Sequence, residues 1–347
     1  MVNTTINVSA DKRRRKYKLL EVIKDIVYKS GFRFRVTSCM EMMNSRQVDI
    51  IQGEGGAFYR GVMACGSVWL CPVCASRITE GRRQELQQAL SENTDLIPVM
   101  ITATLQHEKG DRLFSLMDVL NASLRKMKAG RWWKSLVGEY GIVAHVSSLE
   151  ITYSQAHGWH PHKHMLLFVN KDPDIQALKG AIIEKYTALV AGNGRYASEF
   201  HSIDVTRGDD AVASYIQKWS LVEEIMKANV KDGRHESYSP FQLAELAGSG
   251  EAWAEKAFIE YAQATYRKKQ ITWSHKSRKA LGLGKDKSDQ ELAEAVAGDV
   301  VLCSLSRDQW KKVLKYAMQA EVLEQAEKGG ADAVMRFLSG ISPPDTS

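Results

Sequence analysis

Three histidines at alternating positions are the residues of this sequence best suited to chemistry. His160, His162 and His164 fill every second position of GWHPHKHMLLF, directly before an apolar run. Alternate side chains of a β-strand point to the same face, so a strand here would present all three imidazoles together. Neutral imidazole is the commonest metal ligand among side chains. The pattern favours a metal site over three histidines that only form hydrogen bonds.

A carboxylate is expected beside these histidines, because two imidazoles alone hold a hard divalent ion poorly. Glu150 belongs to LEITY, which the turn SQAHG separates from the histidine strand. A hairpin would bring Glu150 next to the imidazoles. Its alternative role is a surface partner for a basic residue across the strands. A register shift of one residue would turn it to the other face, so the sequence leaves its direction open.

Four of the five cysteines lie in the first 74 residues and indicate a second metal site. Cys71 and Cys74 form a C-x2-C pair, which clips two thiolates onto one zinc ion. Cys39 and Cys65 are the candidates for the other two ligands of a tetrahedral site, and a cytoplasmic chain favours metal over disulfides. The alternative is four reduced cysteines in a core. Cys303, inside VVLCSL, is expected to be a buried small apolar residue.

Tyr215 and Lys218 are the candidate catalytic pair outside the metal sites. They lie three residues apart in SYIQKW, so on a helix both side chains would share one face. A neighbouring cation can favour phenolate and so activate a tyrosine. A tyrosine on an apolar helix is otherwise more often a core residue. The rival tyrosines are Tyr186 and Tyr196, and neither has a lysine three residues on.

The elements that must position these groups follow a β-α-β-β-α-β order. Strand patterns cover 96–107, 143–154, 159–170 and 199–207, and helix patterns cover 113–137, 175–191 and 209–228. This order predicts an α+β fold with a ferredoxin- or RRM-like antiparallel sheet and helices on one face. The two middle strands form the hairpin that carries Glu150 and the histidines.

Three domains are expected along the chain. Residues 1–95 would hold an N-terminal helix, a zinc-ribbon-like four-cysteine segment and a basic helix. Residues 96–230 would form the sheet domain, and residues 231–347 a mostly helical C-terminal region.

Composition indicates a globular protein that is able to bind nucleic acid. The chain has 347 residues, 44% hydrophobic and 25% charged, and a net charge of +6. This basic excess permits contact with nucleic acid without requiring it. The arginines of the basic helix, Arg77, Arg82 and Arg83, face either phosphates or, by default, solvent. No apolar run is long enough to span a membrane and no signal-peptide pattern follows the basic N-terminal residues, so we expect a cytoplasmic location.

Five motifs together resemble the HUH endonucleases, and more narrowly the rolling-circle replication initiators of small bacterial plasmids. They are CGSVWLCPVCASRI, TATLQH, GWHPHKH, the tyrosine–lysine helix SYIQKW, and SPFQLAELAGSGEAWAEKAFIEYAQAT with the ITWS that follows. The five extend over most of the chain and are far more specific than the histidines alone. The resemblance implies an HUH nicking domain in residues 96–230.

The resemblance also implies a set of ligands and a mechanism. His162 and His164, with Glu150 as the third ligand, would hold Mg²⁺ or Mn²⁺ at a scissile phosphodiester of single-stranded DNA. Tyr215 would attack, leaving a 5′-phosphotyrosine and a free 3′-hydroxyl for a host polymerase, and the strand could be rejoined without ATP. The implied partners are plasmid origin DNA, a host helicase and a host DNA polymerase.

Two further residues receive supporting roles from the resemblance. Lys218 would offset charge near the phosphate or lower the pKa of the tyrosine. His160 would support the ligands or contact DNA.

Two positions depart from the family's pattern. The residue between the paired histidines is usually hydrophobic, and here it is Lys163. Some relatives carry a glutamate one helical turn before the tyrosine, which activates water for termination, and here that position is Ala211. The termination step is therefore unassigned.

Rival functions keep part of this chemistry. A relaxase or a single-strand transposase of the same superfamily would use the same residues. A non-catalytic, zinc-containing DNA-binding protein would use the histidines structurally. A zinc hydrolase is disfavoured because no glutamate follows the histidines at helical spacing. The origin sequence, the oligomeric state and the identity of the recruited host proteins do not follow from the sequence.

Overall fold

The computed structural model describes two compact units. The described residues are 2–53, 56–208, 237–295 and 300–341, with side chains from residue 10 on. One unit combines Met1–Ile78 with Lys287–Ser347, and the other is Thr79–Asp286. The domain boundaries expected from the sequence, 1–95, 96–230 and 231–347, stay predictions.

The first unit joins the two ends of the chain through a small sheet. Its elements are α1 (Val2–Lys29), a 3-10 helix (Arg35–Ser38), β1 (Val48–Gly53), β2 (Gly56–Arg60), α11 (Asp289–Glu294), β8 (Val300–Leu305), α12 (Arg307–Lys315) and α13 (Gln319–Ser339). The strand order is β2-β1-β8, and both pairings are antiparallel. The C-terminal region therefore contributes a strand to the N-terminal sheet. Cys303 on β8 is buried, as expected.

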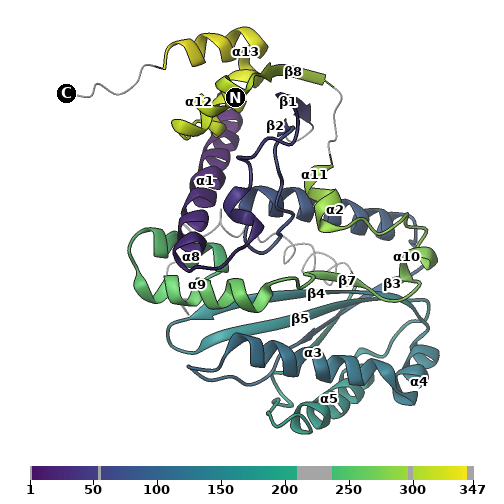
Figure 1. The fold of residues 1–347 in the computed structure, drawn as a ribbon. Coiled ribbons are helices and arrows are strands. Elements are labelled where there is room, and N and C mark those ends of the chain that lie inside the picture. Colours follow the sequence, from purple (N-terminus) through teal and green to yellow (C-terminus); the bar gives the residue numbers. More distant parts are fainter. Residues whose placement is uncertain (1, 54–55, 209–236, 296–299, 342–347) are drawn as a thin grey trace. The chain divides into compact units, whose positions relative to one another are not determined.

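The second unit is built on a five-stranded antiparallel sheet with the order β6-β3-β5-β4-β7 (Figure 1). Its strands are β3 (Ile97–Ala103), β4 (Ile142–Ser154), β5 (Gly158–Val169), β6 (Ile203–Arg207) and β7 (Ile271–Trp273). Its helices are α3 (Leu113–Ala129), α4 (Arg131–Tyr140), α5 (Ile175–Ala191), α8 (Pro240–Gly248), α9 (Ala252–Thr265) and α10 (Ser277–Ala280). Helix α2 (Pro72–Ser91) begins in the first unit and ends in this one.

Local sequence explains where the central hairpin begins. Gly141 ends α4 with a φ of 62°, a left-handed conformation that glycine adopts without strain, and β4 starts at the next residue. The turn after β4 leads to Gly158, whose φ is 76°. The apolar run from Met165 to Val169 on β5 is buried throughout, which fixes the hairpin in the centre of the sheet.

Helices lie on both faces of this sheet. On the histidine face, Leu86 and Ala89 of α2 pack in one apolar cluster with Val146, Leu166 and Phe168 of the hairpin. Helices α3 and α5 lie on the opposite face (Figure 1). The prediction of an α+β fold with antiparallel sheets is confirmed. Helices α3 and α5 of the predicted core share one face, whereas α2, which precedes that core in the sequence, covers apolar residues of the histidine face.

Two further differences concern segment boundaries. The helix expected over 113–137 is two helices, because Gly130 takes an extended conformation between α3 and α4. The region after residue 231 is mostly helical where it is described, but it also supplies β7, which pairs with β4. Among the described residues, no helix combines the length and apolar character that crossing a bilayer requires.

Candidate active site and metal centres

The register of the central hairpin places Glu150 directly across from His162. The neighbouring pairs on the same face are Ser148 with His164 and Thr152 with His160. All three histidines therefore share a face with the glutamate, because side chains alternate along both strands. The structure thus brings together the residues that the sequence suggested, and it settles the direction of Glu150.

His164 is held from both sides of its ring. Its Nε2 lies 2.7 Å from Oε2 of Glu150, and its Nδ1 lies 3.0 Å from the hydroxyl of Thr102 on β3. The side chain is fully buried. An imidazole whose Nδ1 is held by an outer partner presents Nε2 in a fixed direction, which is the usual arrangement of a metal-binding histidine.

His160 and His162 form the less buried end of the same row. Their Nε2 atoms lie 2.7 Å apart, so one nitrogen donates to the other. The ring of His160 also lies against that of His107, with centroids 4.4 Å apart. Burial, with a smaller effect from His107, lowers the pKa of His160 to about 4. His160 is therefore neutral at pH 7 and packs between two other imidazoles.

The atoms of Glu150, His162 and His164 are arranged as ligands of one ion would be. One carboxylate oxygen and one nitrogen from each ring all lie within 4.8 Å of one another. Three protein ligands with the remaining positions open to substrate are typical of a catalytic metal site. A set of two imidazoles and a carboxylate could hold one divalent ion here.

The four early cysteines also converge, in the first unit. Sγ of Cys39 lies 3.5 Å from that of Cys71 and 3.6 Å from that of Cys74, and Sγ of Cys65 lies 3.8 Å from that of Cys74. These separations exclude disulfides, whose sulfurs are about 2.05 Å apart. They match the edges of about 3.8 Å that a tetrahedron with Zn–S bonds of about 2.3 Å would have.

Backbone amides complete this cysteine cluster. The N–H groups of Cys65, Ser67 and Cys74 donate to Sγ of Cys39, Cys65 and Cys71, respectively. All four cysteine side chains are buried. Burial raises the pKa of Cys71, whereas hydrogen bonds from the other thiols lower that of Cys74. Four buried sulfurs at these separations fit a structural zinc site with no open coordination position.

The predicted nucleophile lies outside the described residues, as do Lys218 and Ala211. Of the two rival tyrosines, Tyr186 is fully buried and its hydroxyl donates to the carbonyl of Thr104. Burial raises the pKa of Tyr186, so its hydroxyl is poorly suited to attack. Tyr196 is exposed, and its carbonyl accepts from the amide of Gln106, next to His107.

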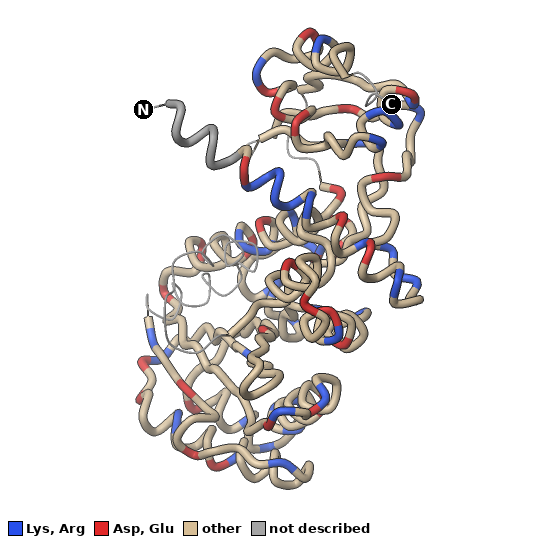
Figure 2. Tube along the Cα trace, turned by 90° about the vertical axis from the view of Figure 1, so that its left-hand side faces the viewer, with Lys and Arg blue, Asp and Glu red and all other residues tan. Residues whose placement is uncertain are grey.

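The arginines of the basic helix α2 have partners within the protein. Arg82 is buried and pairs with Glu85 and Asp286. Arg83 pairs with Glu80, and Arg77 donates to the carbonyl of Ala293 and lies over the ring of Phe58. Blue and red segments alternate along most of the chain, with one basic run near the start of α1 (Figure 2). In that run, Arg13 and Arg14 pair with glutamates of α13.

Two residues of the histidine site were not assigned from sequence. Thr102 and His107 both belong to ITATLQH, for which the sequence predicts a strand but no role for either residue. Strands β3 and β5 pair although they are some 60 positions apart in the chain, as Thr102 and His164 are. Local sequence spacing therefore does not indicate this contact. A polar residue and a histidine at the end of an apolar strand were the only available signal.

Comparisons with known proteins find similarity to replication proteins. A family model described as replication protein matches residues 59–183. The chain is similar to a protein rep of Streptomyces lividans, with 25% identity over 351 aligned positions that cover 79% of this chain and 77% of that protein. It is also similar to a neomycin resistance protein of Streptomyces cyanogenus, with 26% identity over 141 positions, 33% of this chain and 32% of that protein. No solved structure matches the chain.

The matched segment contains both the hairpin with its glutamate and histidines and three of the four clustered cysteines, Cys65, Cys71 and Cys74. The resemblance to plasmid replication initiators is thereby confirmed, and residues 59–183 match the replication protein family.

Proposed function

We propose that this replication protein nicks one strand of plasmid origin DNA and so begins rolling-circle replication. The observation that carries the proposal is the convergence of Glu150, His162 and His164 within the segment matched by the replication protein family. A replication initiator must bind origin DNA, and a nickase must in addition polarise one phosphodiester. The three-residue cluster is suited to that second task.

The proposed core is that of an HUH endonuclease. The order β6-β3-β5-β4, numbered along the core itself, is 4-1-3-2 with every neighbour antiparallel. A ferredoxin-like β-α-β-β-α-β unit has this order. The paired histidines lie on its central hairpin, where the sheet supplies a rigid support for the ligands.

We infer that the cluster holds Mg²⁺ or Mn²⁺. Glu150 supplies an oxygen, and His162 and His164 supply ring nitrogens. Thr102 keeps Nδ1 of His164 occupied, so that Nε2 is left for the ion. When bound, the ion supplies charge that polarises the scissile phosphate. His160 and His107 stack beside this site and support the ring of His162.

The proposed nucleophile is Tyr215. Its phenolic oxygen would form a bond to phosphorus while the bond from phosphorus to the 3′-oxygen breaks. The phenolic proton is lost, the 3′-oxygen is protonated, and the 5′-phosphate remains on the tyrosine. Lys218, on the same face of the predicted helix, would favour the phenolate. A host polymerase would extend the free 3′-hydroxyl while a host helicase separates the strands.

The four-cysteine cluster is proposed to bind one structural zinc ion. Its sulfurs come from the end of a 3-10 helix, a loop and the start of α2. One ion would hold these segments together, and the site is closed to substrate because all four sulfurs are buried.

The deciding experiment incubates the purified chain with single-stranded origin DNA and Mn²⁺, then denatures it. We expect a covalent protein–DNA adduct and a free 3′-hydroxyl on the released strand. Binding without an adduct would support a non-catalytic DNA-binding protein instead. A relaxase or single-strand transposase would also form the adduct, but would act on transfer or element-end sequences rather than on a replication origin.

A further inference from the structure

A pocket lined by three cationic side chains lies on the face of the sheet opposite the histidine row. Lys163 sits between two proposed ligands in sequence, so the alternation of β5 turns its side chain to the other face. The pocket there has a volume of about 330 Å³. It is formed entirely within the second unit, by β4, β5, β7 and helix α3.

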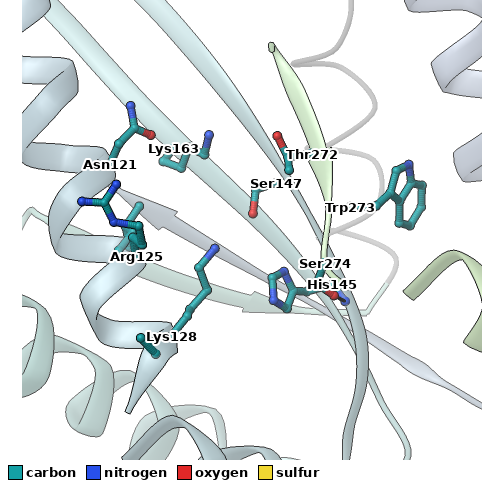
Figure 3. Close-up of a pocket in the computed structure, with 11 residues that line it drawn as sticks. Asn121, Arg125, Lys128, His145, Ser147, Lys163, Thr272, Trp273 and Ser274 are labelled. Carbon is teal, nitrogen blue, oxygen red and sulfur yellow. Dashed lines mark hydrogen bonds between the residues drawn. The ribbon is translucent and has the colours of Figure 1, made fainter. Parts of the chain in front are cut away.

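Positive charge gathers in this pocket. Arg125 and Lys128 reach it from α3, and Lys163 reaches it from the sheet (Figure 3). None of the lining residues is acidic, and within the described part of the chain no carboxylate forms an ion pair with these three cations. Burial of Lys128 lowers its pKa, in keeping with a cation that lacks a counter-charge.

The neutral lining combines apolar surface, from Leu124, Ala129 and Trp273, with hydrogen-bonding groups. Ser147 of β4 and Thr272 of β7 are direct neighbours across the two strands, and both line the pocket. His145 lines its lower part in Figure 3, and the buried Nδ1 of His145 has no hydrogen-bond partner among the described residues. Burying a polar group costs free energy unless the group forms a hydrogen bond. A ligand that forms a hydrogen bond with this nitrogen and pairs with the cations would therefore be stabilised here.

We propose that this pocket binds the phosphate group of a nucleotide. Three cations beside hydroxyl groups form a site for an anion that accepts several hydrogen bonds. Phosphate is such an anion, because it accepts several charge-assisted hydrogen bonds at once. Pockets that bind small molecules have volumes from about 300 Å³ upward, and this pocket reaches that size. It therefore has room for more than inorganic phosphate. The nucleotide is either free or part of a single strand.

This site is distinct from the proposed nicking site. The two lie on opposite faces of one sheet, and the pocket involves neither the carboxylate nor the imidazoles of the metal cluster. Binding can therefore be measured in buffer without added divalent metal, where no nicking is expected. A failure of the proposed cleavage would leave this test unaffected.

The test titrates the full chain with thymidine 5′-monophosphate and with a short oligothymidylate, by calorimetry in phosphate-free buffer. Lys163→Met and Lys128→Met each keep the aliphatic length but remove the charge. Lys134→Met, at an exposed lysine of α4 outside the pocket, is the matched control. Thermal melting confirms that each variant is folded, and the two pocket variants come from different elements.

We expect each pocket variant to weaken binding about tenfold or more, as the loss of a charged hydrogen bond does, and Lys134→Met to bind as the wild type. Loss with the mononucleotide identifies a free nucleotide as the ligand. If only the oligothymidylate binds, a strand phosphate is the ligand, and each pocket variant should reduce the slope of log K against log salt by about 0.7. Wild-type affinity in both pocket variants, an equal loss in Lys134→Met, or no binding of either probe to the wild type would overturn the proposal.

Discussion

The carboxylate of Glu150 lies 2.7 Å from Nε2 of His164 although the two residues are not direct partners in the hairpin. The direct partner of Glu150 is His162, so the carboxylate reaches diagonally across to the next histidine of the row. This diagonal contact explains why one glutamate can serve both rings. Without an ion, the contact also keeps the buried His164 paired.

Replacing Glu150 with glutamine tests whether nicking requires the negative charge of this side chain, because glutamine has nearly the same shape. Glu150→Gln keeps an oxygen beside His164 but removes the negative charge that would help hold a divalent ion. We expect a loss of nicking rate of about 100-fold or more, because metal stabilisation of a transition state is worth several kcal/mol. Origin binding, measured by gel shift, should change little, since affinity comes mainly from contacts with phosphates. Unchanged nicking by this variant would exclude Glu150 as a ligand.

His160 should behave differently from the other two histidines of its row. Its ring contacts His162 and His107 rather than Glu150, so its loss should weaken metal binding by about 10- to 100-fold without removing a ligand. Excess Mn²⁺ should therefore rescue nicking by His160→Ala. The same excess should not rescue His162→Ala or His164→Ala. Equal loss in all three variants, with no rescue, would show that the ligand pair is chosen wrongly.

Tyr215 is predicted to carry the covalent adduct. Phenylalanine at this position keeps the ring and removes the attacking oxygen, so Tyr215→Phe should bind origin DNA and form no adduct. Lys218→Ala should slow adduct formation without abolishing it. The control is Tyr196→Phe, which alters an exposed tyrosine and should leave the adduct unchanged. Peptide mapping of the adduct checks the assignment, and a nucleotide found on Tyr196 would refute it.

How far the site could be predicted depended on whether each feature is local in the chain. The shared face of the three histidines follows from the two-residue period of a strand, and the C-x2-C pair from one helical turn. The direction of Glu150 required the register of the hairpin, which a single-residue shift would have reversed. His107 and Thr102 approach the site through pairing of β3 with β5, which leaves no mark in local spacing.

The fold, like the site, was predictable from local sequence patterns but not where distant segments pair. The order of strands and helices in the core was visible as alternating periodicity, and the antiparallel hairpin followed from a short turn between two strands. Pairing of β8 with β1 joins segments some 250 positions apart, and no local pattern predicts it. Lys163 occupies a position where the family has an apolar residue, and only the packing of α3 on that face shows that it enters a pocket lined by two other cations.

The cysteine cluster should bind one zinc ion per chain. Cys74→Ser removes one of four sulfurs, so the zinc content should fall and the melting temperature with it, because a structural ion stabilises only the folded state. Cys303→Ser is the matched control: it replaces a buried cysteine on β8, outside the cluster. Elemental analysis after gel filtration measures the zinc. A folded wild-type chain free of zinc would contradict this prediction.

His145 should make stability depend on pH, with a sign set by its burial. Burial lowers the pKa of its imidazole to about 3, and Lys128 adds a smaller effect in the same direction. An unfolded histidine titrates near pH 6.5. Between about pH 6.5 and pH 3, therefore, the unfolded chain binds a proton that the folded chain does not. The free energy of unfolding should fall as pH falls through this window, and above it His145 should add no pH dependence.

The variant His145→Gln removes this titration and keeps a polar side chain. Between about pH 6 and pH 4, the free energy of unfolding of the wild type should fall more steeply than that of the variant, by up to about 1.4 kcal/mol per pH unit. Urea denaturation at several pH values measures both slopes. His157→Gln, at an exposed histidine of the turn between β4 and β5, should keep the wild-type slope. Both proteins carry the same cysteine cluster, so any acid-induced loss of zinc cancels in the comparison. Equal slopes for the wild type and His145→Gln would mean that the folded and the unfolded imidazole take up a proton over the same pH range, so that burial does not lower the pKa of His145.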